Sequence, residues 1–397
     1  MTLARLALLP RDGLFLKDGR GWYTSDIGRS HSLAWPEPPT IRGALRAAAG
    51  RALIASGRTL QRTDWDAAPQ DLALQRMVTF RRPVGDGITP TDRLWPAPAD
   101  TVLLAGASHF VRLDPRPPPS GGHPTLGAAH EPAALERLWR PGSLPGGKPL
   151  PRPAFWTESD FAAWLRADAV RPPEPAAMAD LAPPRRPEVH VTIDPLTGAA
   201  ADTLLFSGEI VESLTRDHHE WGLAVECELP PGVAALPAGP LPLAGRRRLT
   251  HTLPAPADLF AAPRDLGADA PGLRLVLVTP AEFERGWLPD GFDESPDPER
   301  GPYLGRIPGL DAELALRAAI VPRPQHLSGW DMARRRPRPT RRLVPAGAVY
   351  FFQRADAKPF TAEDRRALWL RAWGRGTTDG LGLVVAGRWD IQAKDRT

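Results

Sequence analysis

Short apolar runs with the alternation of β-strands recur along the whole chain and predict a protein rich in sheets. Residues 3–9 form a first apolar run, and residues 189–193 (VHVTI) and 222–228 (GLAVECE) alternate with period two. Residues 273–279 (LRLVLVT) are mostly apolar, and residues 349–352 (VYFF) are β-branched or aromatic, so both are expected to be buried strands. Further strands are expected at residues 77–81, 101–105, 204–206 and 381–385.

Helical periodicity is rarer and predicts a few helices between these strands. The strongest pattern begins after three prolines, where Thr40 is the expected N-cap and Gly57 the expected stop. Thr361 and Asp364 have capping-box spacing and predict a helix that extends to Gly374. Two more helices are expected, at residues 133–139 and 156–169.

Loose alternation of strands and helices predicts an α+β fold rather than a doubly wound sheet. The chain has 397 residues, enough for two to three domains, and its 48 prolines and 36 glycines indicate many loops. A Pro/Gly-rich stretch at residues 114–153 is expected to be an insertion. A second such stretch at 171–187 is the expected linker, which divides the chain into residues 1–187 and 188–397.

Arginine dominates the charged residues. Only four of the 50 basic residues are lysine, so 50 − 4 = 46 are arginine. Arginine makes bidentate phosphate contacts and stacks on bases, which suits an RNA-binding protein. A GC-rich genome gives the same bias without any function. Cys227 is the single cysteine, which excludes an internal disulfide and a cysteine zinc site.

The candidate RNA contacts fall in four regions of the sequence. An arginine run between Ser328 and Phe352 lacks acidic residues, and its prolines favour an extended arm. The first helix, a loop before it, a GRRR segment and a C-terminal glycine-rich loop carry the rest. Solvated loops and an ordinary amphipathic helix are the alternative interpretations. The candidates are Arg29, His31, Arg42, Gly43, Arg46, Arg246, Arg247, Arg248, Arg334, Arg335, Arg336, Arg338, Arg341, Arg342, Gly376, Gly380 and Gly382.

Motifs for phosphate, dinucleotide or metal chemistry are missing from the sequence. It has no GxxxxGK[ST], no GxGxxG after a strand and no HExxH. We therefore expect no cofactor, no metal and no catalytic residue. Histidine could still act as general base in a metal-free ribonuclease, and His31 and His190 are the candidates, although a structural histidine is the commoner case. The first apolar run is too short for a signal peptide or membrane span, so a cytoplasmic protein is expected.

Six segments, in order along the chain, resemble the RAMP superfamily of CRISPR–Cas proteins. More narrowly, they are similar to the third subunit of the type III-B Cmr effector complex. They include WPEPPTIRGALRAA, TDRLWPAPAD and TPAEFERGW, and later GWDMARRRPRPTRRLVPAGAVYFF. VHVTIDPLTGAAADTLLFS and the glycine-rich GTTDGLGLVVAG complete the set.

This resemblance implies a fold, a role and partners. The fold would be two ferredoxin-like, RRM-type domains that face each other. The role would be non-catalytic: to hold the repeat-derived 5′ tag of crRNA. The neighbours would be the large polymerase-like subunit and the backbone subunit, with target RNA met indirectly. The alternative is a metal-independent RAMP endonuclease that processes precursor crRNA.

Overall fold

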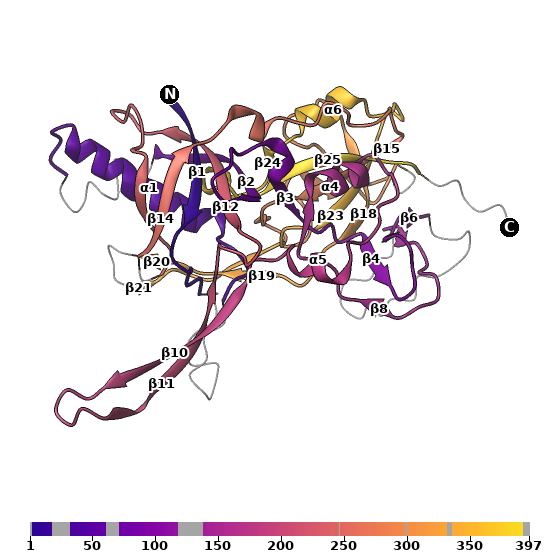
Figure 1. Ribbon diagram of the computed structural model, residues 1–397. Coiled ribbons are helices and arrows are strands. Elements are labelled where there is room, and N and C mark those ends of the chain that lie inside the picture. The colour runs from indigo at the N-terminus through magenta and orange to yellow at the C-terminus, as the bar shows by residue number, and fades with distance from the viewer. Residues whose placement is uncertain are drawn as a thin grey trace.

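Two seven-stranded antiparallel sheets form the body of the protein (Figure 1). The structure is a computed structural model that describes residues 2–17, 32–60, 71–117, 138–245, 247–297, 300–331 and 336–391. Few helices accompany the sheets, so the α+β class is confirmed. A long two-stranded hairpin projects from the body.

The first sheet has the strand order β13-β14-β1-β12-β2-β3-β9. Its central neighbours β14, β1, β12 and β2 are all antiparallel, so β1 and β2 run in the same direction on either side of β12. The strands are β1 (Thr2–Pro10), β2 (Ala73–Pro83), β3 (Arg93–Pro96), β9 (Phe155–Thr157), β12 (His219–Leu229), β13 (Gly239–Leu243) and β14 (Arg248–Pro254).

Helix α1 (Pro38–Ala55) packs its apolar stripe on this sheet. Ile41 and Leu45 are fully buried in one cluster with Leu8 and Leu223. The predicted helix is confirmed, but Thr40 as its N-cap is wrong, because the helix begins at Pro38 and Glu37 is the cap. Proline is favoured at the first helical position since its missing N–H would have no intrahelical partner. Gly57 follows the helix with φ of 89°, as expected of a stop.

The second sheet has the strand order β16-β17-β18-β23-β15-β25-β24. Its central neighbours β18, β23, β15 and β25 are again all antiparallel. The strands are β15 (Gly272–Leu277), β16 (Phe292–Glu294), β17 (Tyr303–Gly305), β18 (Leu314–Ile320), β23 (Val349–Arg354), β24 (Arg371–Ala372) and β25 (Leu383–Trp389).

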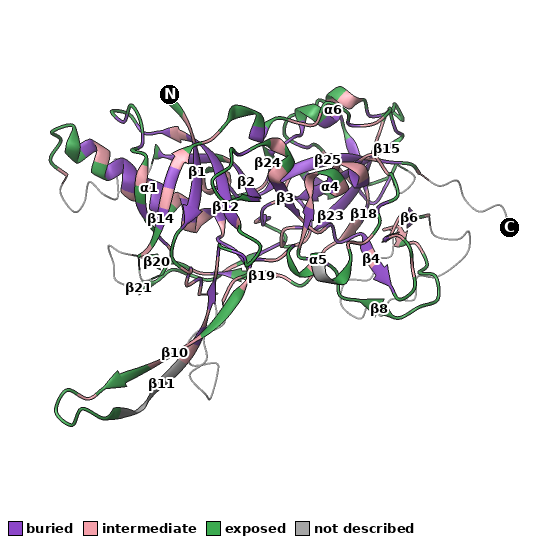
Figure 2. Cartoon of the chain, viewed as in Figure 1, coloured by how far each residue is buried: buried purple, intermediate pink, exposed green. Residues whose placement is uncertain are grey.

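A shared apolar core joins the two sheets. Because side chains alternate along a strand, Leu8 of β1 faces α1 while Leu9 faces the other way. Leu9 lies in one buried cluster with Phe80 of the first sheet and with Phe351 and Val385 of the second. Figure 2 shows buried residues in both sheets. The two halves therefore bury apolar surface against each other.

A buried ion pair fixes the segment after β3 to the second sheet. Arg274 of β15 and Asp100 lie 3.0 Å apart, with side chains 1% and 0% exposed. The indole Nε1 of Trp164, in helix α4 (Glu158–Leu165), donates to Asp100 at 3.0 Å. A buried charge is tolerated only when it is paired and hydrogen-bonded, which explains why these polar groups converge.

The helix expected at residues 156–169 is confirmed in shorter form, as α4.

Three short strands lie in the described part of the insertion expected at residues 114–153: β6 (Pro115–Arg116), β7 (Arg140–Pro141) and β8 (Pro149–Leu150). β6 pairs with β7, and β8 pairs with β4 (Thr101–Leu104), which lies before the insertion and also pairs with β5 (Val111–Arg112). The helix expected at residues 133–139 lies almost wholly outside the described residues.

The sheets do not divide the chain at residue 187, where the proline-rich stretch predicted a boundary. Strands β12, β13 and β14 follow that stretch and still belong to the first sheet, because β12 fills the space between β1 and β2. The change of sheet falls between Pro254 and Gly272, across the short helix η4 (Ala257–Phe260). The expected linker contains helix α5 (Pro175–Ala179) and the start of β10.

Strands β10 (Arg185–Ile193) and β11 (Ala200–Val211) form the projecting hairpin. The strand predicted at residues 189–193 is confirmed. Val189, Val191 and Ile193 on it are exposed, because the hairpin leaves the body (Figure 2).

Helix α6 (Ala362–Ala367) starts at the predicted capping box of Thr361 and Asp364. It ends well before Gly374, because Leu370 takes a left-handed φ of 53° and β24 begins. Among the described residues, no helix is long and apolar enough to cross a membrane.

Candidate nucleic-acid interface

The arginine run forms a β-hairpin, here called the arm (residues 325–343). Strand β19 (Gln325–Leu327) pairs with β22 (Arg341–Leu343), and β20 (Trp330–Asp331) pairs with β21 (Arg336–Pro337). The predicted extended conformation is confirmed. In Figure 1 the arm runs along the side of the body from which the β10–β11 hairpin departs.

Apolar and polar contacts anchor the base of the arm. Leu327 and Leu343 are buried in a small cluster with Leu381 of the glycine-rich loop. The amide of Gln325 donates to the Glu37 carboxylate, the cap of α1, at 2.6 Å. Burial raises the pKa of Glu37 to about 7, and the hydrogen bond from Gln325 opposes that shift. The arm is therefore fixed to the start of α1.

The arginines of the arm differ in their environments. Arg341 donates from Nε to Glu282 at 2.9 Å and lies 3.4 Å from Asp379. Arg336, Arg338 and Arg342 are exposed. These three side chains, which we call the arm surface, keep their charge in the solvent. Arg334 and Arg335 lie outside the described residues.

Asp379 connects the arm with α1. It lies in the short helix η5 (Thr377–Asp379) and accepts a hydrogen bond from Nη1 of Arg42 at 2.8 Å. Arg42 also donates from Nε to the carbonyl of Leu72 at 2.7 Å. Two guanidinium groups thus meet one carboxylate, with side chains 16–27% exposed. Arg46 lies one turn further along α1, is half-buried and has interactions of its own.

The glycine-rich loop packs against the protein instead of opening into a cradle. Gly376, Gly380 and Gly382 all take left-handed φ angles, between 67° and 84°. A Cβ on Gly380 would stand 2.7 Å from Leu74, so the loop lies directly on the first sheet. The N–H groups of Gly380 and Gly382 donate to the carbonyls of Thr377 and Pro280. These glycines allow the turn that holds Asp379 in place.

The start of α1 offers little to a phosphate group, contrary to our expectation. The first two helical residues, Pro38 and Pro39, have no N–H, and the N–H of Thr40 donates to the Glu37 carbonyl at 2.9 Å. Gly43 is exposed, and no described atom lies within 4 Å of where its Cβ would stand. Packing within the described chain therefore does not explain why a glycine stands inside this helix.

The GRRR segment lies at the start of β14, beside the projecting hairpin. Arg248 lies 3.4 Å from Glu188 of β10. Arg247 is exposed and takes a left-handed φ of 51°. Arg246, like Arg29 and His31, lies outside the described residues. Arg248 pairs with Glu188 on the projecting hairpin, so the described structure does not bring it together with Asp379.

Two kinds of site chemistry remain to be compared with the structure: histidine as a general base, and metal binding. His190 lies on β10, with Nε2 2.9 Å from the Glu188 carboxylate. His219 lies 3.0 Å from Asp217. Within the described ranges, no group of three or more His, Cys, Asp or Glu side chains is placed to hold a metal ion.

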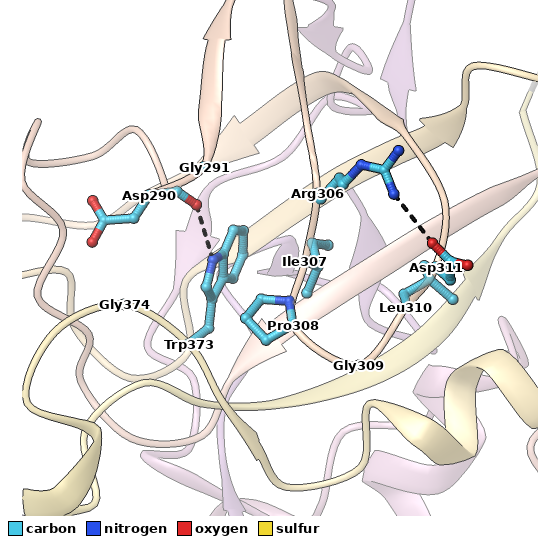
Figure 3. A pocket seen from close by; sticks show the side chains of 10 residues that line it. All are labelled: Asp290, Gly291, Arg306, Ile307, Pro308, Gly309, Leu310, Asp311, Trp373 and Gly374. Atoms are coloured by element: carbon cyan, nitrogen blue, oxygen red, sulfur yellow. Dashed lines mark hydrogen bonds and ion pairs between the residues drawn. The ribbon is translucent and has the colours of Figure 1, made fainter.

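One open pocket, of about 760 Å³, lies beside the strand that leads into the glycine-rich loop (Figure 3). The indole of Trp373 forms part of its wall and donates to the carbonyl of Asp290 at 3.1 Å. At its rim Arg306 pairs with Asp311 at 3.1 Å. Two acidic residues, Asp290 and Asp311, line the pocket, and its one cation, Arg306, is already paired, so the pocket offers no clear site for an anion.

The family model for CRISPR-associated protein (Cas_Cmr3) matches residues 6–389. The chain belongs to this family. The resemblance drawn from the six segments is thereby confirmed at the level of the family. Among curated proteins, none gives a significant match.

Solved structures of CRISPR effector complexes are similar to this Cmr3-family chain. One is a chain of the Type III-B Cmr-beta bound to cognate target RNA and AMPPnP, with a TM-score of 0.41, 11% identity, and coverage of 89% of this chain and 86% of that one. The same complex with target RNA alone has a TM-score of 0.40 and 10% identity, with coverage of 87% of this chain and 86% of that one. A chain of the Csm3-Csm4 subcomplex in the type III-A CRISPR-Cas interference complex has a TM-score of 0.32 and 6% identity, with coverage of 87% of this chain and 92% of that one.

Proposed function

We propose that this Cmr3-family chain is a non-catalytic subunit of a type III-B CRISPR effector complex that holds the repeat-derived 5′ tag of crRNA. The observation that supports this most is the arm: an extended cationic hairpin with a fixed base. Arg336, Arg338 and Arg342 are exposed on it, while Arg341 is held by Glu282 and Asp379. An anchored row of arginines can follow the backbone of a single strand.

The position of Gly43 also supports close approach by a partner at α1. Glycine in a helix interior costs about 1 kcal/mol relative to alanine. Gly43 is exposed with open space around it, so packing within the described chain does not account for it. Close contact with an RNA backbone or a neighbouring subunit gives a reason for the missing side chain.

We further propose that each sheet is one ferredoxin-like RAMP domain. In the first sheet, β1, β2, β12 and β14 follow one another along the chain and have the spatial order β14-β1-β12-β2. In the second sheet β15, β18, β23 and β25 have the equivalent order, read from the other end. Both correspond to the order 4-1-3-2. On this proposal the domains meet between Pro254 and Gly272.

The proposed partners are the crRNA tag, the large polymerase-like subunit and the backbone subunit, with target RNA met indirectly. The β10–β11 hairpin extends from the body, and the arm lies along it, and both leave exposed surface for these partners (Figure 2). The proposal requires no cofactor.

The alternative is a metal-independent endonuclease for precursor crRNA. His190 with its Glu188 partner is the described pair that could act as general base. One experiment separates the two functions: the full chain is incubated with labelled repeat RNA in EDTA. The proposal predicts that the RNA is bound and stays uncut. Its affinity should fall with salt, and in a log–log plot the slope should be about −0.7 for each phosphate contact. Cleavage that is lost in His190→Ala would overturn it.

A further inference from the structure

Trp330 stands apart from the other tryptophans of the described chain. It lies on β20 of the arm and is 55% exposed, and it is the one tryptophan among the large exposed hydrophobic residues that the structure describes. Trp95, Trp164 and Trp373, by contrast, are almost fully buried. An indole is a large apolar surface, so leaving it in water gives up favourable burial. A ligand that covers the ring would recover it.

The arm places Trp330 in line with cationic groups. Strand β19 ends at Leu327, and Trp330 opens β20 two residues after Ser328. Arg342 stands opposite His326 in the ladder, and both are exposed. Trp330 follows His326 by four residues, so their Cα atoms lie no more than about 14 Å apart. Arg338 pairs through its N–H with the carbonyl of Gly329, next to the indole, at 2.8 Å.

The charge of the arm points to an anionic ligand. Residues 321–345 contain seven arginines and a single acidic residue, Asp331. Trp330 stands opposite Pro337 in the ladder, and the residues on either side of Pro337 are the exposed Arg336 and Arg338, so its neighbours among the described residues of this ladder include no second large apolar side chain. A protein-docking site would surround a tryptophan with other apolar groups. A lone exposed aromatic ring among arginines fits a single-stranded nucleic acid, whose bases stack while its phosphates pair.

We propose that Trp330 is a stacking platform for one unpaired base of single-stranded RNA that follows the arm, with Arg342 pairing to a phosphate of the same strand. This inference rests on the proposed RNA-binding function and adds a base contact to it. Stacking is tolerant of sequence, since every base has a π-face, so the site anchors a splayed nucleotide without strict base choice. Pro337, opposite Trp330, supports one side of the platform.

The test compares RNA with and without bases. The probes are fluorescent RNAs of eight adenosines and of eight abasic riboses, each titrated with the full chain. We expect Trp330→Ala to weaken binding of the adenosine RNA about tenfold, and to leave binding of the abasic RNA unchanged. Trp330→Phe should retain most of the affinity. Leu150→Ala, which also removes an exposed apolar side chain, is the matched control and should change neither titration.

The outcomes separate this inference from the proposed function. If the wild-type chain binds neither RNA, both fail. If it binds both RNAs and Trp330→Ala weakens both equally or neither, the stacking role is overturned and RNA binding stands. If Trp330→Ala leaves both titrations unchanged but releases protein subunits from the purified complex, the ring docks a protein and the inference is wrong.

Discussion

Asp379 accepts a hydrogen bond from Arg42 at 2.8 Å, although the two residues are 337 positions apart in the chain. Arg341 approaches the other oxygen of the same carboxylate at 3.4 Å. One acidic side chain in a glycine-rich turn thus joins the first helix, the C-terminal loop and the base of the arm. Asp379 and Glu282 pair with the two arginines of this cluster, whereas Arg336, Arg338 and Arg342 lie outside it and are exposed.

Arg42→Ala should destabilise the protein, because it leaves the Asp379 carboxylate and the Leu72 carbonyl without this donor. A charged hydrogen bond of this kind contributes about 1.5–3 kcal/mol. We expect a loss of that order in the free energy of unfolding, measured by urea denaturation. Arg342→Ala removes an exposed arginine and is the matched control, with an expected change within about 0.5 kcal/mol. Equal effects of the two substitutions would contradict the structural role of Arg42.

Replacement of Arg336, Arg338 and Arg342 by alanine should weaken RNA binding and reduce its salt dependence. Loss of three phosphate contacts lowers the log–log salt slope by about 2. The control is an equal charge change at Arg285, Arg300 and Arg306, whose side chains are 47–68% exposed and pair with acids of the second half. Salt titrations of both triple variants measure the slope. A slope that falls equally in both would show that net charge, not the arm surface, is responsible.

Gly43→Ala should stabilise the isolated chain and weaken its binding. Alanine is favoured over glycine in a helix by about 1 kcal/mol, and a Cβ at Gly43 meets no described atom within 4 Å. Thermal unfolding measures the gain, and retention of RNA and neighbouring subunits in the purified complex measures the loss. Gain without loss would mean that nothing approaches α1 at this point.

Gly380→Ala should lower the free energy of unfolding by more than a Gly→Ala substitution that introduces only backbone strain. Gly380 has a φ of 84°, and a Cβ there would stand 2.7 Å from Leu74. Gly85 has a similar φ of 92° with no described atom within 4 Å, so Gly85→Ala isolates the strain of about 1 kcal/mol. Urea denaturation of both variants gives the difference. If both lose the same stability, the glycine-rich loop does not depend on its close contact with the first sheet.

Stability should fall with rising pH through the titration of Glu37. Burial raises its pKa from 4.5 to about 7, so the folded state holds a proton that the unfolded state has released. The contribution of Glu37 is therefore fully present below about pH 4.5 and is lost as the pH rises to 7. Glu37→Gln removes this titration. The difference in unfolding free energy between wild type and variant should change over this interval, and a constant difference would contradict the raised pKa.

Local patterns predicted nine of the strands and three of the helices, because alternation and capping are properties of adjacent residues. The buried strands at 273–279 and 349–352 and the capping box of Thr361 illustrate this. The sheet partners could not be predicted in the same way. Strand β12 returns to lie between β1 and β2, a long-range pairing that a proline-rich stretch at 171–187 obscured.

The candidate site was predicted as a set of cationic side chains, and the structure shows which of them are already paired with acidic side chains. The residue types identified Arg42 and Arg341 but not their common partner, Asp379, because the contacts join segments far apart in the chain. Gln325 and Glu37 also carried no signal, because their contact joins segments 288 positions apart. The prolines at 38 and 39 were the one readable sign that the start of α1 lacks free N–H groups.

The most direct test of the account is the sequence of the 5′ ends of RNA that copurifies with the chain from its own cells at moderate salt. The account predicts one repeat-derived 5′ end for the wild-type chain, together with Cmr subunits, and loss of that RNA when Arg336, Arg338 and Arg342 are replaced by alanine. Random 5′ ends, or the same tag retained by the triple variant, would contradict the assignment of the arm to the crRNA tag.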